Sequence, residues 1–300
     1  MKTEQQTDYT EAVVRKTPSH LDPQDIAFVA KLRESVLSQP WTKEAFAEIK
    51  QAQIAYLREV LARSEDTEFV FARTQEILKE VSLLQHSAIA EGGENLNGLE
   101  RGAPVILATN HLSTYKLAGF SPETELGLKI RDYRYLCPTP MFIGGFTPVA
   151  EKLGNTLAIV SDDFPGVLGQ IHRAAGFVHV PPKETTGGSR IEYLREQTAE
   201  VFKKHPQTAL VNFPEGQSSG KHRGLGPYEL ERFRTGGYVI AAELGVRVIP
   251  VAQYFDPKQG LQLKVFPSYI PKQNEDAGYK VYAKRDQEEM QKWLDAKLGR

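Results

Sequence analysis

The sequence has very little cysteine. Cys137 is the one cysteine among 300 residues, so the chain cannot form an intramolecular disulfide bond, and no grouping of cysteine and histidine has the spacing of a metal site. Long apolar runs are also missing: none approaches the roughly 20 residues that cross a bilayer, and the first residues lack the apolar core of a signal peptide. We therefore expect a cytoplasmic protein that contacts a membrane at most at its surface.

An excess of charge of either sign is absent as well. The chain has 37 Lys and Arg against 38 Asp and Glu, a formal net charge of −1. Nucleic-acid binding needs a concentrated basic surface, so we expect no nucleic-acid partner. The remaining composition, 40% apolar and 25% charged, is that of an ordinary globular protein, and the length allows a large core with a smaller second unit.

The first ninety residues have the pattern of helices. Residues 22–40 begin with Asp-Pro and end at a proline, as a capped helix does. From Trp41 to about Ile89, apolar residues recur three and four positions apart, and Ser64 is a candidate break between two helices. We predict a helical N-terminal domain over residues 1–92.

Residues 93–300 alternate short β-branched runs with helical patterns, which indicates a second domain of the α/β class. Most of the runs are apolar on both faces, as in buried parallel strands. Expected strands are 104–108, 156–160, 177–180, 208–213, 246–254 and 261–266, and expected helices are 189–205 (opened by a Ser189–Glu192 capping box), 228–244 and 284–298. The predicted fold is a mixed, mainly parallel sheet covered by helices and preceded by an all-helical unit.

Two polar segments follow expected strands, where ligand sites of open α/β sheets lie: "TNHLSTYK" (109–116) and "FPEGQSSGKHRGLGP" (213–227). His111 is the best candidate for chemistry, because a near-neutral imidazole can take the proton of an attacking hydroxyl. The alternative is that it ends the strand and bonds to backbone. In "FPEG", Gly216 allows close backbone approach and Glu215 could accept hydrogen bonds from a polyol or orient a neighbour; alone, the tetrapeptide indicates a turn.

Taken together, the two segments resemble the motifs of the glycerolipid acyltransferase superfamily, the PlsC-like enzymes that include glycerol-3-phosphate and lysophosphatidate acyltransferases. The family's first motif is Asn-His, four variable residues and Asp; its third is Phe-Pro-Glu-Gly followed by Thr-Arg. This sequence has "NHLSTYK" and "FPEGQSS" in the same order, about 100 residues apart. The second and fourth motifs look like "GFVHVPPK" (176–183) and "VRVIPVA" (246–252). The resemblance covers about residues 95–270.

The resemblance implies transfer of a fatty acyl group from acyl-CoA or acyl carrier protein to a hydroxyl of a glycerolipid-like or other lipid alcohol. It makes His111 the general base beside Asn110, with the acyl thioester as co-substrate and no other cofactor or metal. Lys183, Lys221 and Arg223 could supply cations near the substrate, although the basic loop at 221–223 is also what a solvated surface segment looks like. The candidate substrate-binding residues are Phe213, Pro214, Glu215 and Gly216 of the turn, with Lys183, Lys221 and Arg223 as candidate compensating cations.

Three charged positions depart from the family pattern. Lys116 stands at the position of the aspartate, and a protonated lysine cannot accept a hydrogen bond from the histidine and lowers its pKa. Ser218 stands at the arginine of the third motif, and Pro182, beside Lys183, at that of the second. Because those arginines usually meet the acceptor's phosphate, their loss argues against a glycerol-phosphate acceptor.

Several alternatives remain for the histidine. Another carboxylate could orient its ring, or a buried, neutral Lys116 could accept the ring proton. The chain could also be a catalytically degenerate relative that binds acyl or lipid ligands, or a partner, without turnover. The candidate carboxylates are Glu123, Glu125, Asp162 and Glu215.

Aromatic residues of the N-terminal helices could provide the apolar surface for contact with a membrane. Aromatic residues on helices more often belong to a protein core, which is the alternative for this group. The residues are Trp41, Phe46, Phe69 and Phe71.

Overall fold

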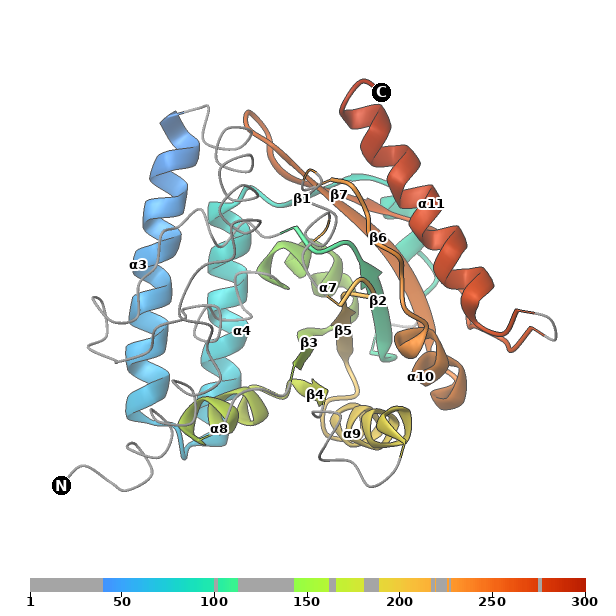
Figure 1. Ribbon diagram of the computed structural model, residues 1–300. Coiled ribbons are helices and arrows are strands. Elements are labelled where there is room, and N and C mark those ends of the chain that lie inside the picture. Colours follow the sequence, from blue (N-terminus) through green and yellow to red (C-terminus); the bar gives the residue numbers. More distant parts are fainter. Residues whose placement is uncertain are drawn as a thin grey trace, which may run out of the picture.

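The computed structural model of this chain is built around a seven-stranded sheet (Figure 1). It describes residues 40–99, 102–112, 143–161, 166–180, 189–216, 219, 226, 228–274 and 277–300. The strands lie in the order β1-β7-β6-β2-β5-β3-β4. Their bounds are β1 Ala88–Glu91, β2 Val105–Thr109, β3 Asn155–Ser161, β4 Val178–Val180, β5 Thr208–Asn212, β6 Arg247–Asp256 and β7 Gly260–Val265.

The sheet is mixed and mainly parallel, as predicted. All neighbouring strands run parallel except β6 and β7, which are antiparallel. β2 is central, between β5 and β6, and each of its five residues is buried. Its run of Val, Ile and Leu suits a strand that is covered on both faces.

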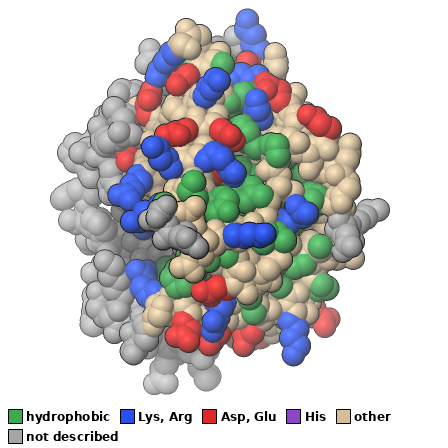
Figure 2. All heavy atoms as spheres, turned by 90° about the vertical axis from the view of Figure 1, so that its right-hand side faces the viewer, with side chains coloured by type: hydrophobic (Ala, Val, Ile, Leu, Met, Phe, Trp, Pro, Cys, Tyr) green, Lys and Arg blue, Asp and Glu red, His purple; other side chains and the backbone are tan. Residues whose placement is uncertain are grey.

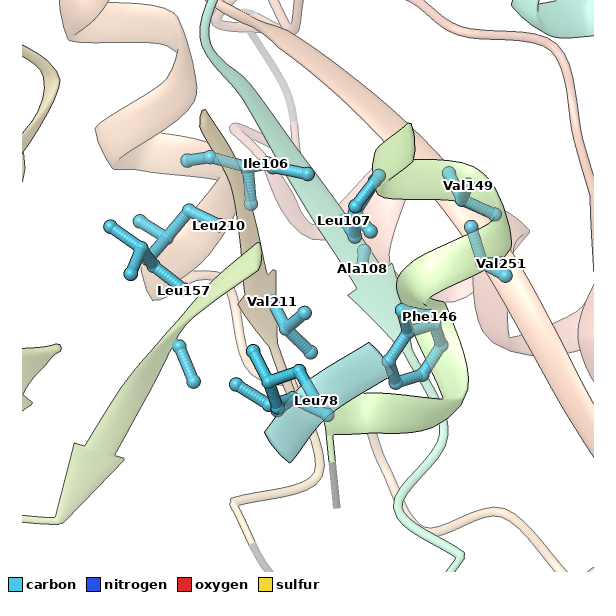
Figure 3. Packing of buried hydrophobic residues seen from close by; sticks show 14 of the residues in the cluster. Leu78, Ile106, Leu107, Ala108, Phe146, Val149, Leu157, Leu210, Val211 and Val251 are labelled. Atoms are coloured by element: carbon cyan, nitrogen blue, oxygen red, sulfur yellow. The ribbon is translucent and has the colours of Figure 1, made fainter. Parts of the chain in front are cut away.

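Helices cover both faces of the sheet (Figure 1). α4, η4 and α7 contact one another, and α7 packs on β3 and β5; α10 packs on β2 and β6, and α11 on β6. In Figure 3, Leu107 of β2 and Val211 of β5 lie in one cluster with Leu78 of α4 and Phe146 of η4. The bounds are α3 Pro40–Ala62, α4 Thr67–Leu84, η1 Gly93–Leu96, η4 Gly144–Phe146, α7 Thr147–Leu153, α8 Gly166–Ala174, α9 Arg190–Lys204, α10 Gly236–Leu244 and α11 Lys280–Lys297.

The N-terminal helices are present, with one unpredicted addition after them. α3 and α4 are separated as expected, but the cap of α4 is Asp66, whose carboxylate accepts from the backbone N–H of Phe69 at 3.0 Å. Strand β1 follows α4 and pairs with β7. The domain boundary at residue 92 stays a prediction, and the helix expected at 22–40 lies outside the described residues, apart from Pro40, which begins α3.

Two predicted helices need correction. The helix at 189–205 forms as α9, but no side-chain capping bond from Ser189 is present among the described contacts. The helix expected over 228–244 begins only at Gly236. The backbone N–H groups of Leu230 and Glu231 donate to the side chains of Gln291 and Glu215, and that of Arg234 to a carbonyl oxygen of Pro214. Because these donors have partners elsewhere in the chain, the segment is held out of the helix.

The four aromatic residues of the N-terminal helices belong to the core or pack against it. Phe46 is buried, and Trp41, Phe69 and Phe71 are partly buried. Trp41 stacks on His86, and Phe71 on His205, with ring centroids 4.6 and 4.2 Å apart. Within the described residues, no helix has the length and apolar character to cross a membrane.

Candidate active site

The two polar segments leave the sheet side by side. Ala108 of β2 pairs with Asn212 of β5 in parallel register, so the residues that follow each strand emerge at the same edge of the sheet. The rings of His111 and Phe213 are in contact, with centroids 4.3 Å apart and planes tilted by 38°. Sequence positions about 100 residues apart are therefore brought together at the carboxyl ends of two central strands, as the sequence predicts.

Phe213 to Gly216 form a tight turn. The backbone N–H of Gly216 donates to the carbonyl oxygen of Phe213 at 2.9 Å. Gly216 has a φ of 72°, in the left-handed region, and a β-carbon on it would lie 2.8 Å from the guanidinium of Arg234. The turn therefore needs glycine for its conformation and for the close approach of Arg234.

The Glu215 side chain connects this turn to the histidine segment. Its Oε1 accepts from the backbone N–H of His111 at 3.1 Å and from the Ser219 hydroxyl at 2.6 Å, and its Oε2 accepts from the backbone N–H of Glu231 at 2.7 Å. Ser219 binds the same segment: its hydroxyl accepts from the His111 N–H, and its own N–H donates to the His111 carbonyl, both at 3.1 Å. Glu215 and Ser219 thus hold the backbone of His111 from both sides.

Burial and hydrogen bonding have opposing effects on the pKa of the Glu215 carboxyl. It is 2% exposed, and burial raises its pKa to about 7, while the bonds from Ser219 and from the backbone of Glu231 and His111 favour the ionised form and oppose that rise. The carboxyl consequently titrates near neutral pH within the hydrogen-bonded group that positions His111.

The Asn110 side chain is held in place by hydrogen bonds to the backbone of Gln253. It is fully buried, donates to the carbonyl oxygen of Gln253 at 3.0 Å and accepts from the Gln253 N–H at 2.8 Å. The Gln253 side chain returns a bond to the Asn110 carbonyl oxygen at 2.5 Å. These bonds fasten the end of β2 to β6, directly before His111. A catalytic role for Asn110 stays a prediction.

The remaining predicted site residues fall outside the described part of the chain. Of the candidate carboxylates, Glu215 is the one that the structure places, and its contact with His111 is to the backbone N–H. The undescribed site residues are Lys116, Lys183, Lys221 and Arg223, together with the departures Pro182 and Ser218 and the candidates Glu123, Glu125 and Asp162.

The structure adds partners that the sequence analysis missed. Ser219 stands three residues after Gly216, a local signal that could have been used, whereas Gln253 and Glu231 are distant in sequence and carried no signal of their own. The described residues contain no group of three or more His, Cys, Asp or Glu that could hold a metal ion.

Comparison with solved structures finds chains of similar architecture. The crystal structure of the 1-acyl-sn-glycerophosphate (LPA) acyltransferase PlsC from Thermotoga maritima aligns with a TM-score of 0.47 and 17% identity, over 92% of this chain and 98% of that one. No family model and no curated protein sequence matches the chain. A similarity of this degree carries no argument about the site, which rests on the contacts described above.

Proposed function

We propose that this protein is an acyltransferase that moves a fatty acyl group from acyl-CoA or acyl carrier protein to a hydroxyl of a lipid alcohol. The observation that carries the proposal is the joining of His111 to the Phe213–Gly216 turn through Glu215 and Ser219. Both sequence motifs that suggest acyl transfer thus belong to one hydrogen-bonded group.

His111 is the proposed general base. As the acceptor oxygen attacks the thioester carbonyl, its proton passes to the imidazole; the carbon–sulfur bond then breaks, and the sulfur leaves as thiol when it takes that proton. General-base assistance of this kind contributes about a hundred- to ten-thousandfold in rate. Glu215 and Ser219 act as positioning residues, because their described bonds to His111 are to its backbone.

Turnover is measured as acceptor-dependent release of thiol from acyl-CoA and from acyl carrier protein, with long-chain alcohols, monoacylglycerol and lysophospholipids as acceptors. The proposal predicts release well above the acceptor-free background with at least one pair. Release from one donor alone would identify the donor class.

A degenerate, non-transferring protein is the second candidate, favoured by Lys116 at the position of the aspartate. The variant Lys116→Asp separates the two. If wild type releases no thiol above background and Lys116→Asp does, the chain has the acyltransferase architecture without the activity, and the proposed function is wrong. If wild type turns over, the lysine is compatible with catalysis.

A further inference from the structure

A pocket of about 660 Å³, lined in part by Glu215, lies between the chain before α10 and the first half of α11. Its volume is in the range of about 300 to 1,000 Å³ that small-molecule sites occupy. The residues that line it are Glu215, Glu231, Arg232, Phe233, Arg234, Thr235, Lys280, Ala283, Lys284 and Gln287.

Cations outnumber carboxyl groups in this lining. Arg232, Arg234, Lys280 and Lys284 face two glutamates. Lys284 lies 3.6 Å from Glu288 on the exposed surface of α11; the other three cations make no ion pair with any residue that the structure describes. The Glu215 carboxylate already accepts three hydrogen bonds from its neighbours. The pocket therefore carries an excess of positive charge that a bound anion would neutralise.

The wall that bears the arginines is held in place by the candidate active site and by α11. The backbone N–H of Arg234 donates to the Pro214 carbonyl at 2.8 Å, and its guanidinium lies against Gly216. On the opposite side, the N–H of Leu230 donates to the Gln291 side chain at 2.8 Å. The arginine segment thus has a fixed position between the turn and α11, which lowers the ordering cost of binding a ligand.

From these features we infer that the pocket binds a phosphate group carried by one substrate of the proposed acyltransferase. Guanidinium groups bind phosphate oxygens in pairs, and lysines add point charges. The inference rests on the proposed function for the identity of the carrier, which is either the nucleotide part of the donor thioester or a phosphorylated acceptor. Arg232 and Arg234 then provide, from another part of the chain, the cations that the motif positions Pro182 and Ser218 lack.

The face on which α11 lies carries both charged and hydrophobic side chains. Figure 2 views the molecule from the side on which α11 lies in Figure 1, and shows Lys and Arg side chains, interspersed with Asp and Glu, around a central area of hydrophobic side chains. Lys280 and Lys284 are exposed residues of this helix. An acyl-bearing molecule with a phosphate would meet both kinds of surface on this side.

Isothermal titration of the full chain with CoA, glycerol 3-phosphate and inorganic phosphate tests the inference. We expect at least one of the two organic probes to bind. The double variant Arg234→Gln/Lys280→Gln should bind that probe about tenfold more weakly, or weaker still. Lys292→Gln, an exposed lysine farther along α11, is the matched control and should stay within about twofold. Binding of CoA identifies the donor as the carrier, and binding of glycerol 3-phosphate identifies the acceptor.

Two outcomes overturn the inference: no binding of any probe to wild type at millimolar concentration, or binding that the double variant leaves unchanged. Circular dichroism melting of each variant checks that it is folded, and the single variants Arg232→Gln and Arg234→Gln serve if the double variant is not. Thiol release is followed in parallel. If wild type releases thiol but the variants bind the probes as wild type does, the phosphate pocket is wrong and the proposed function stands. If the variants bind the probes more weakly but wild type releases no thiol, the pocket stands and the proposed function is wrong.

Discussion

Glu215 joins three parts of the chain through one carboxyl group. It accepts from the His111 segment, from Ser219 and from the chain before α10, while burial raises its pKa to about 7. The titration of such a buried carboxyl affects the stability of the protein, and its hydrogen bonds fix the position of the segments that it joins.

The titration of Glu215 predicts a specific dependence of stability on pH. The ordinary pKa is 4.5 and the folded value about 7, so between these values the unfolded chain has released a proton that the folded chain keeps. The contribution of this group to the free energy of unfolding therefore falls as pH rises through that window, by on the order of 3 kcal/mol. Urea unfolding at pH 5 and pH 8 measures it.

Glu215→Gln is the comparison for this measurement. The variant cannot titrate at this position, so its free energy of unfolding should change less between the two pH values than that of wild type. It should also be less stable throughout, because an amide nitrogen would face a backbone N–H donor. An equal pH dependence in wild type and variant would show that the carboxyl does not titrate in this window.

Gly216→Ala tests the close approach of Arg234. Gly245→Ala is a matched control, since Gly245 has a similar φ, 66° against 72°, but no atom lies within 4 Å of its would-be β-carbon. Each change should cost about 1 kcal/mol from its backbone conformation, read from urea unfolding. Only Gly216→Ala should reduce thiol release, because only there must a neighbouring side chain move. Equal losses of release in both would contradict this account.

At the level of the elements, β2 depends on β6 for the position of its last residues. Asn110→Ala removes the acceptor of the Gln253 N–H and the donor to its carbonyl oxygen. Buried polar groups left without partners cost about 1 to 3 kcal/mol, so we expect a destabilisation of that size in urea unfolding. Thiol release should also fall, because the next residue is His111. Asn97→Ala, at an exposed position, is the control and should leave both measurements close to wild type.

The elements that could be predicted from the sequence are those whose pattern is local. The apolar run of β2 and the helical period of α9 are readable in a few consecutive residues. Residues 228–235 carry a similar helical pattern, but their N–H donors bind Glu215, Pro214 and Gln291, and no window of sequence contains those partners. β1 was missed for the same reason: its four residues become a strand by pairing with β7, about 170 residues away.

The candidate site also has parts that could be predicted from local sequence and parts that could not. His111 and the Phe213–Gly216 turn could be found because each follows an apolar strand and each has a short motif. The bonds that join them could not, since parallel register between β2 and β5 decides which side chains meet. The pocket beside them could not be predicted either, because the sequence pattern favours a helix over 228–244. In a helix, Arg232 and Arg234 would point in opposite directions, whereas in the structure both line the pocket.

For the molecule as a whole, α11 has a buried polar attachment to the rest of the chain. The Tyr269 hydroxyl donates to Asp286 at 2.5 Å, and Arg285 lies 2.9 Å from the same carboxyl. Asp286 is fully buried; burial raises its pKa, and the bonds from Tyr269 and Arg285 oppose that rise. Tyr269 itself bonds through its backbone to Val248 of β6, so this group connects α11 to the sheet.

Tyr269→Phe should loosen that attachment. Removing one donor from a buried carboxyl costs about 1 to 3 kcal/mol, measured as a lower free energy of unfolding in urea. Since α11 forms one wall of the pocket, the variant should also bind CoA or glycerol 3-phosphate more weakly than wild type does. Tyr193→Phe, on the more exposed α9 surface, is the control. Unchanged stability in Tyr269→Phe would show that the Asp286 group does not fasten the helix.

His111, held by Glu215 and Ser219, is the base of the acyl transfer that we propose. The most direct measurement compares kcat/KM for thiol release between wild type, His111→Gln and the control His205→Gln, a half-buried histidine stacked on Phe71. We expect a loss of about a hundredfold or more for His111→Gln alone. A His111→Gln enzyme within about threefold of wild type would contradict it.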